Sequence, residues 1–160
     1  MKLIASSHIY NVYIQALSSR GRDGEREAVA AMVKELFGDS ALCHKENGAP
    51  FIAGSDKHIS ISHGAGYAVI AVSDAPVGVD IEAPRTQLER IRHKFMRDDD
   101  VAETLLHAWT AKEAAFKAGG VDGITVHDIN VEDCRAFVPG HGWKTIAFYD
   151  FNDYLIAVAH

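Results

Sequence analysis

Apolar residues recur along the chain with two different periods, which divide it into helical and extended segments. Over about residues 24–37 they repeat along one face of a helix, and Gly38 ends that pattern. A second helix is predicted over about 98–118, before Gly119 and Gly120, and the sequence after Pro84 predicts a short helix over 85–94. The predicted strands are 2–5, 8–14, 58–62, 67–73, 77–82, 124–132, 135–139, 143–150 and 153–160.

Two of these predicted strands resemble each other. YAVIAVS at 67–73 and DYLIAVA at 153–159 share the letters IAV at a separation of 86 residues. This echo suggests two similar halves, about 1–75 and 76–160, each a helix packed on a small antiparallel sheet. We therefore predict an α+β fold in one domain spanning 1–160, rather than a doubly wound parallel sheet.

Composition and charge narrow the classes of function. The 160 residues are 48% apolar and carry a formal net charge of -6, which argues against a nucleic-acid partner. No stretch approaches the ~20 apolar residues of a membrane span, and polar residues interrupt the N-terminal apolar run. We predict no membrane partner, no signal peptide and a cytoplasmic monomer, with Cys43 and Cys134 as free thiols rather than a disulfide.

The segment GVDIE at 78–82 is the first with candidate chemistry. On a strand, Asp80 and Glu82 share one face, with side chains roughly 7 Å apart. Two such charges repel by about 2.5 kcal/mol at an effective dielectric near 20. The pair is either the wet face of a half-buried strand or part of a site for a hard cation such as Mg²⁺.

Two further segments carry charged or polar groups. In WTAKEAAFK, at 109–117, Trp109 and Phe116 share a helix face that we assign to the core, while Lys112, Glu113 and Lys117 lie together on another. The charged residues are either an exposed i,i+4 pair or part of a site. In ISISHG, at 59–64, the strand end bearing Ser62 and His63 is either a polar cap or a phosphate contact.

Together these segments resemble the 4'-phosphopantetheinyl transferase superfamily, in its surfactin-synthetase-activating branch. GVDIE matches the pattern G-[IV]-D-[IVL]-E, and WTAKEAAFK matches W-[ST]-x-K-E-[AS]-x-x-K. The strand end ISISH and the upstream segment NGAPF, at 47–51, also resemble family segments. The resemblance covers roughly residues 44–120 and implies the α+β fold of that family.

The resemblance implies transfer of 4'-phosphopantetheine from coenzyme A to a serine of an acyl or peptidyl carrier protein, with Mg²⁺ as cofactor. It implies a magnesium set of Asp80, Glu82 and Glu113, and catalytic roles for Glu113 and Lys117. The implied coenzyme A contacts are Ser62, His63, Lys112, Lys117, Gly48 and Pro50, with His63 on the 3'-phosphate. Glu113, Asp99 or a water molecule is the implied general base.

The chain also departs from the family pattern. Ala49 stands where the family usually has lysine, the segment between GVDIE and WTAKE is shorter than usual, and the N-terminal half is abbreviated. Two other functions therefore stay open. One is a non-catalytic relative that binds coenzyme A or a carrier protein, and the other is a magnesium-dependent phosphohydrolase, which would use the same acidic residues.

Overall fold

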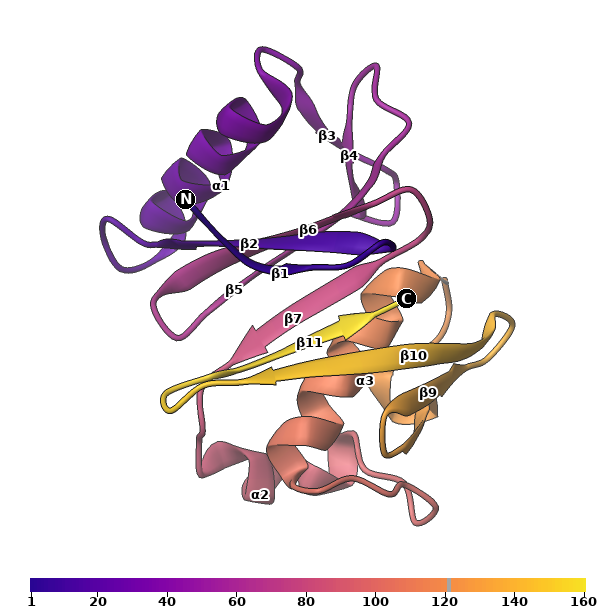
Figure 1. Ribbon diagram of the computed structural model, residues 1–160. Helices are drawn as coiled ribbons and strands as arrows, with labels where there is room; N and C mark the ends of the chain where they lie inside the picture. The colour runs from indigo at the N-terminus through magenta and orange to yellow at the C-terminus, as the bar shows by residue number, and fades with distance from the viewer. Residues whose placement is uncertain (121) are drawn as a thin grey trace.

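The computed structural model describes residues 1–120 and 122–160, and it contains two main antiparallel sheets and a short hairpin, with helices packed on the sheets (Figure 1). The strands are β1 (Lys2–Ser6), β2 (Tyr10–Ala16), β3 (Leu42–His44), β4 (Pro50–Ile52), β5 (His58–Gly64), β6 (Tyr67–Ser73), β7 (Gly78–Glu82), β8 (Asn130–Glu132), β9 (Arg135–Val138), β10 (Gly142–Asp150) and β11 (Leu155–Ala159). The helices are α1 (Arg22–Phe37), α2 (Gln87–Ile91) and α3 (Leu105–Gly119), with 3₁₀ turns η1 (Arg92–Lys94) and η2 (Val126–Asp128).

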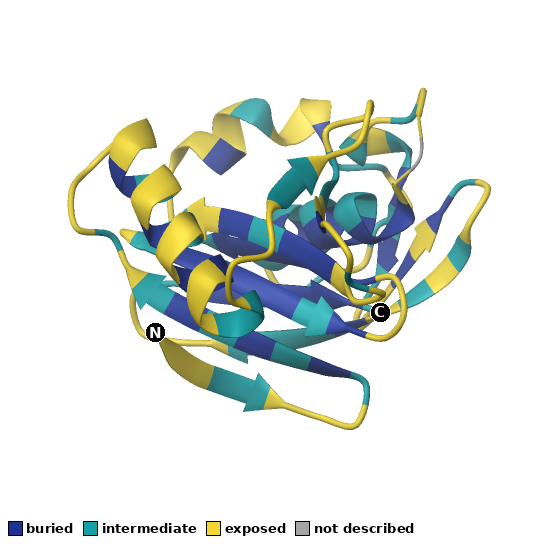
Figure 2. Cartoon of the chain, turned by 90° about the horizontal axis from the view of Figure 1, so that it is seen from above, coloured by how far each residue is buried: buried dark blue, intermediate teal, exposed yellow. Residues whose placement is uncertain are grey.

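The first sheet has the strand order β1-β2-β6-β5, and α1 packs against it. The apolar stripe predicted for this helix buries Ala28, Met32 and Val33 against strand residues such as Ile59 and Ile70. Figure 2 shows the result, with exposed positions on the outer side of the helix and buried positions along the strands beneath it.

The second sheet has the order β7-β11-β10-β9-β8, and α3 covers one of its faces. The chain passes from the first sheet to the second between β6 and β7, at residues 74–77. The two sheets share a core in which Val12 of β2, Val79 of β7 and Ile156 of β11 are all buried. The predicted α+β class, a helix on each of two small antiparallel sheets, is therefore confirmed.

The structure corrects the start of the long helix. α3 begins at Leu105 rather than near 98, because Thr104 is extended and its hydroxyl caps the helix by accepting a hydrogen bond from the amide of His107. The residues before it are held by Asp100, whose carboxylate accepts from the amides of Arg97 and Val131. The local side-chain bonds of Asp100 and Thr104 thus compete successfully with helix formation.

Other boundaries differ less. The predicted strand over 124–132 is a 3₁₀ turn followed by β8, and the predicted helix over 85–94 is α2 followed by η1. The hairpin of β3 and β4 was not predicted. Cys43 and Cys134 are free thiols, and no helix among the described residues combines the length and apolar character needed to cross a bilayer.

Candidate functional site

Helix α3 lies directly on β7 because position 78 has no side chain. A Cβ atom at Gly78 would overlap the carbonyl oxygen of Ala114 and lie 2.6 Å from the amide nitrogen of Ala118. Alanine at both helix positions completes the close approach, since neither carries a bulky group. The two charged helix residues Glu113 and Lys117 are thereby brought to the strand that carries the two acidic residues of GVDIE.

Asp80 is the best-connected residue of the site. Its Oδ1 accepts hydrogen bonds from Ser62 Oγ and Lys117 Nζ, both at 2.8 Å. Lys117 Nζ also donates to Ser62 Oγ and to the carbonyl oxygen of Val79, both at 3.1 Å. The other carboxylate oxygen, Oδ2, is buried and has no hydrogen-bond partner among the described residues. A buried acceptor without a partner is costly in a folded protein.

Glu82 follows on the same face of β7. Its Oε1 accepts from Trp109 Nε1 at 3.0 Å and from the Arg85 guanidinium at 2.8 Å. Burial raises the pKa of Glu82 and the negative charge of Asp80 adds to that rise, while the contacts from Trp109 and Arg85 oppose it. Because the pKa of Glu82 is raised overall, the contacts from Trp109 and Arg85 do not fully offset the cost of burying its negative charge.

Glu113 projects from α3 toward the same region. Burial raises the pKa of Glu113, and the negative charges of Asp80 and Glu82 raise it further, against the lowering effects of Lys117 and Arg85. The Glu113 carboxylate forms no ion pair with a described residue. The exposed Glu113–Lys117 pair, one of the two alternatives left by the sequence, is absent from this part of the chain, because Lys117 pairs with Asp80 instead.

Three carboxylates therefore share one electrostatic environment. As the side chains stand, no three His, Cys, Asp or Glu groups within residues 1–120 and 122–160 converge closely enough to enclose a metal ion. The donor chemistry nevertheless fits a hard divalent cation, because all three groups supply oxygen and one buried oxygen of Asp80 is unsatisfied. Burial is the main cause of the raised pKa values of Glu82 and Glu113, and the neighbouring carboxylates add to it; a cation between them would offset both effects.

A small cavity opens beside Glu113 and Lys117. Its volume is about 320 Å³, and Asn47, Gly48 and Pro50 form part of its lining. Asn47 fixes this wall: its side chain accepts from the amide of Ala49 and donates to the carbonyl oxygen of Gly120, at the end of α3. Gly48 adopts φ 82°, a left-handed conformation that favours glycine at this turn.

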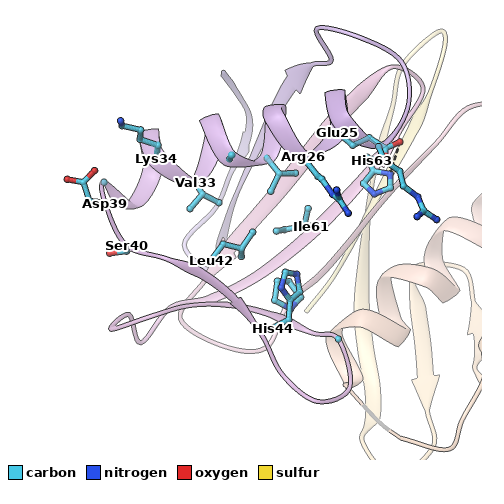
Figure 3. Close-up of a pocket in the computed structure, with 16 residues that line it drawn as sticks. Glu25, Arg26, Val33, Lys34, Asp39, Ser40, Leu42, His44, Ile61 and His63 are labelled. Carbon is cyan, nitrogen blue, oxygen red and sulfur yellow. Dashed lines mark ion pairs between the residues drawn. The ribbon is translucent and has the colours of Figure 1, made fainter.

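A larger cavity of about 850 Å³ lies between α1 and strands β3 to β5 (Figure 3). Gly48, Pro50 and Ile61 line both cavities, so the two spaces adjoin. The basic side chains that line the larger one are Arg22, Arg26, Lys34, His44 and His63. Figure 3 shows His63 next to Glu25, whose carboxylate lies 3.5 Å from His63 Nδ1. A polar, mostly basic rim over apolar residues of α1 and β5 suits an anionic ligand with an apolar part.

Comparison with known proteins identifies the family. A family model described as the 4'-phosphopantetheinyl transferase superfamily matches residues 76–159, more than half of the chain. The chain belongs to this superfamily. The matched region contains β7 and α3, and with them all three acidic residues of the carboxylate cluster (Asp80, Glu82 and Glu113).

Two curated superfamily relatives are similar to part of the chain. A protein named 4'-phosphopantetheinyl transferase from Bacillus subtilis is 31% identical over 88 residues, which cover 48% of this chain and 39% of the relative. A protein named 4'-phosphopantetheinyl transferase psf-1 from Bacillus pumilus is 34% identical over 74 residues, covering 39% of this chain and 32% of the relative. The chain thus spans less than half the length of these relatives.

In this superfamily member, Lys112 does not join the cluster. Its side chain is fully buried, with Nζ 2.6 Å from Asp100 Oδ2 and donating to the carbonyl oxygen of Ile129 at 2.6 Å. Lys112 therefore faces the core between α3 and β8 rather than either cavity. The expectation that it contacts a phosphate is wrong for this structure, because its ammonium group is already enclosed by two oxygen partners.

Asp99 also lies apart from the carboxylate cluster. Its carboxylate is exposed and pairs with Arg97 at 2.8 Å. The hydrogen bond from Arg97 lowers the pKa of Asp99, and none of the charges acting on it belongs to the cluster. Its neighbour Asp100 takes the buried position beside Lys112. Asp99 is therefore separated from the groups around Asp80, whereas Glu113 lies within range of the Asp80 charge.

The two predicted residues at the end of β5 lie in different places. Ser62 lies inside the cluster on Asp80, whereas His63, whose side chain is 51% exposed, lines the larger cavity. Trp109, which we had assigned to the core, packs on Phe95 but also donates to Glu82. The basic residues of α1 that line the larger cavity (Arg22, Arg26 and Lys34) were not predicted as site residues, although Arg26 and Lys34 lie within the helix predicted over 24–37.

Proposed function

We propose that this protein transfers the 4'-phosphopantetheine group of coenzyme A to a serine hydroxyl of an acyl or peptidyl carrier protein, using Mg²⁺ and releasing 3',5'-ADP. The observation that carries the proposal is the state of Asp80. One of its oxygens is fully engaged by Ser62 and Lys117, while the other is buried and unsatisfied beside two more carboxylates. The printed names of the two Bacillus relatives agree with this activity.

The residues that would hold the magnesium ion are Asp80, Glu82 and Glu113. When bound there, Mg²⁺ would neutralise the pyrophosphate and the charge that develops on the departing 3',5'-ADP. Trp109 and Arg85 fix one oxygen of Glu82 and so restrict how that carboxylate can turn. Ser62 and Lys117 restrict Asp80 in the same way, which leaves its free oxygen directed at one place.

The two adjoining cavities would divide the coenzyme A molecule between them. In the larger cavity, His63 would contact the 3'-phosphate, and the nearby Arg22 and Arg26 supply fixed positive charge. The smaller cavity, lined by Gly48, Pro50 and Lys117, would take the pyrophosphate end. Lys117 lines this space, and turning from Ser62 Oγ or from the Val79 carbonyl oxygen would release one of its three N–H groups for a phosphate oxygen while the bond to Asp80 is kept.

In the chemical step, the serine oxygen of the carrier protein forms a bond to the β-phosphorus of coenzyme A. The bond from that phosphorus to the oxygen bridging to the α-phosphate breaks, and 3',5'-ADP leaves. The serine proton passes to the Glu113 carboxylate, directly or through water. Glu113 suits this role because it lines the smaller cavity next to Lys117 and its carboxylate forms no ion pair with a described residue.

The test is to incubate the protein with coenzyme A, Mg²⁺ and several apo-carrier proteins. We expect a mass increase of one phosphopantetheine on a carrier protein, matched by release of 3',5'-ADP. Asp80→Asn should remove both signals while leaving the circular dichroism spectrum unchanged. Asp153→Asn, an exposed carboxylate in the loop before β11, is the matched control and should retain full activity.

Two other results would contradict the proposal. Release of 3',5'-ADP at the same rate without any carrier protein would indicate a phosphohydrolase. Tight binding of coenzyme A with no product for any carrier protein would indicate a non-catalytic relative. Ala49, which lines the smaller cavity where the family usually has lysine, is the feature that would then explain the loss.

A further inference from the structure

Strands β5 and β7 lie side by side although they belong to different sheets (Figure 1). β5 is the last strand of the first sheet and β7 is the first strand of the second, so the two halves of the molecule meet along this line. Three alternate residues of β5 face β7 there, and all are small: Ser60, Ser62 and Gly64. A Cβ atom at Gly64 would lie 2.5 Å from the carbonyl oxygen of Ile81, so the approach is close.

The edge of β7 that faces β5 is completed by side chains. On its other edge β7 pairs with β11. At Val79, which is fully buried, the amide donates a hydrogen bond to Ser60 Oγ at 3.0 Å, and the carbonyl oxygen accepts one from Lys117 Nζ at 3.1 Å. Backbone groups buried at the edge of a sheet need such partners, because water cannot reach them. Ser60 and Lys117 thus take the place of a neighbouring strand.

Ser60 is linked to the carboxylate cluster through this one backbone position. Val79 directly precedes Asp80, and Lys117 bonds both the Val79 carbonyl oxygen and Asp80 Oδ1. Ser62, the next residue of β5 that faces β7, donates to the same oxygen of Asp80. A movement of β7 away from β5 would therefore lengthen the Ser62–Asp80 bond and displace the ammonium group of Lys117 at the same time.

The opposite face of β5 belongs to the ligand cavities. Ile61 and His63, which alternate with the small residues, line the larger cavity. β5 is held to β6 by an antiparallel register that runs from His58 to Gly64. Loss of one hydroxyl group from β5 leaves this pairing in place, and with it the wall of the larger cavity. The effect of Ser60 is therefore expected on β7 rather than on the site beside α1.

We propose that Ser60 is a positioning residue, which acts through the Val79 amide to hold β7 at the distance from β5 that places Asp80 and Lys117. This inference deepens the proposed transferase function and rests on it, because it identifies what keeps the reacting groups in register. The Ser60 hydroxyl itself takes no part in the transfer. A misplacement of about 1 Å can slow an enzyme about 100-fold, so a single hydrogen bond at this point can matter for turnover.

Three variants separate positioning from stability. Ser60→Ala removes the acceptor of the Val79 amide, and Ser60→Thr keeps a hydroxyl group at that position. The matched control is Ser73→Ala, because Ser73 is also a buried serine, whose hydroxyl accepts from the amide of Ala75 at 3.1 Å and donates to the carbonyl oxygen of Ile9 at 2.9 Å. Ser73 lines neither of the two adjoining cavities. The two alanine variants should lower the denaturation midpoint by similar amounts.

Nuclear magnetic resonance of the ligand-free protein tests the positioning directly. In Ser60→Ala the Val79 amide should exchange with solvent at least about tenfold faster than in the parent, because its acceptor is gone. The ammonium signal of Lys117 should shift or broaden, since its oxygen partners on β7 are no longer held in place. Ser73→Ala and Ser60→Thr should leave both signals close to those of the parent.

Turnover is then measured with saturating coenzyme A, Mg²⁺ and apo-carrier protein. We expect Ser60→Ala to lower kcat by about tenfold or more, while the dissociation constant of coenzyme A, measured without Mg²⁺, stays within about twofold of the parent. Ser73→Ala should keep the parent values of both quantities. Ser60→Thr should keep kcat within about threefold of the parent.

Several outcomes would overturn the inference. Equal losses of kcat in Ser60→Ala and Ser73→Ala would assign the effect to stability alone. A loss in Ser60→Thr as large as in Ser60→Ala would show that the size of the side chain, and not its hydroxyl group, decides. If the parent transfers no phosphopantetheine but the two resonance signals change in Ser60→Ala alone, the proposed activity fails and the positioning of β7 stands. Transfer at the parent kcat in Ser60→Ala gives the reverse result.

Discussion

Helices α1 and α3 each pack on an antiparallel sheet, but they approach their sheets differently. α3 buries alanines at 108, 111, 114, 115 and 118, and its backbone rests on Gly78 of β7. α1 buries Ala28, Met32 and Val33, while Val29 and Ala30 line the cavity of about 850 Å³ beside it. The same arrangement of helix on sheet thus produces a close contact in one half and an open space in the other.

The difference separates two tasks. Close packing of α3 fixes Lys117 against Asp80 and holds Glu113 within range of the Asp80 charge, which a carboxylate cluster requires because small displacements change its electrostatics strongly. The space beside α1 provides volume and basic side chains for a ligand. Substitutions in α3 and β7 should therefore disturb stability or chemistry, whereas those in the α1 cavity should disturb binding.

The largest effect is expected within α3 itself. Lys112→Met leaves Asp100 buried without its cation and should lower the free energy of unfolding by about 3–5 kcal/mol. Lys117→Met should destabilise much less, since that side chain is 28% exposed, yet it should abolish transfer. Chemical denaturation and the carrier-protein mass assay measure the two quantities. Replacing both buried partners, as Asp100→Leu/Lys112→Met, should recover part of the stability. Equal destabilisation by Lys112→Met and Lys117→Met would contradict a structural role for Lys112 and a functional role for Lys117.

Gly78→Ala tests the close contact between α3 and β7. The new methyl group would overlap the Ala114 carbonyl oxygen, so we expect a loss of about 2–3 kcal/mol of stability and a loss of transfer activity. Ala30→Leu places more atoms beside the α1 cavity and should change stability by less than about 1 kcal/mol while weakening coenzyme A binding. Thermal denaturation of both variants distinguishes a tight from an open interface. Similar losses in the two would show that the halves do not differ in this way.

Glu113→Gln separates the chemistry from ligand binding. The amide keeps the size of the side chain but cannot accept the serine proton, so kcat should fall by at least about 100-fold, or about 2.7 kcal/mol of activation free energy. Coenzyme A affinity at saturating Mg²⁺ should fall much less, since Asp80 and Glu82 remain. Single-turnover kinetics and calorimetry provide the two readouts. A variant with normal turnover would remove Glu113 from both proposed roles.

His63→Ala tests the α1 cavity. The loss of one contact to the 3'-phosphate should weaken coenzyme A by about tenfold, with little change for 3'-dephospho-coenzyme A. Titration calorimetry with both ligands is the measurement. If both ligands weaken equally, His63 acts only as a polar strand end paired with Glu25.

The smallest effect is on stability in the absence of metal. Burial raises the pKa of Glu113 above 4.5 in the folded protein, so the folded state holds its proton more tightly than the unfolded state. The free energy of unfolding should therefore fall as pH rises through the raised pKa of Glu113. Below about pH 4.5 the carboxyl group is protonated in both states, so the cost of burying its charge should be absent. Without Mg²⁺, the free energy of unfolding of Glu113→Gln should decrease less with pH than that of the parent. Saturating Mg²⁺ should reverse the decrease in the parent. Denaturation curves across this pH range with and without Mg²⁺ provide the comparison; parallel curves for parent and variant would show that Glu113 carries no such penalty.

Local patterns were sufficient for much of the site. Alternation along β7 predicted that Asp80 and Glu82 share a face, since successive side chains on a strand point to opposite sides. Helical periodicity placed Glu113 and Lys117 on one side of α3, because residues four apart are neighbours. The prediction that Lys112 shares their face was wrong, since Lys112 meets Asp100 on another side of the helix. These relations depend only on backbone geometry within one element, so a single segment of sequence contains them.

Relations between elements required the tertiary structure. Lys112 and Lys117 are both lysines of one helix, yet one is enclosed by Asp100 and the other joins Asp80. Five residues along a helix correspond to about 140° of rotation, so the two side chains point to different neighbours. Which neighbour each one meets depends on how α3 sits between β7 and β8. The sequence by itself determined most of the helices and strands, the acidic pair and the family pattern. Long-range packing decided which charges meet, because the energy of a buried charge depends on the groups that surround it.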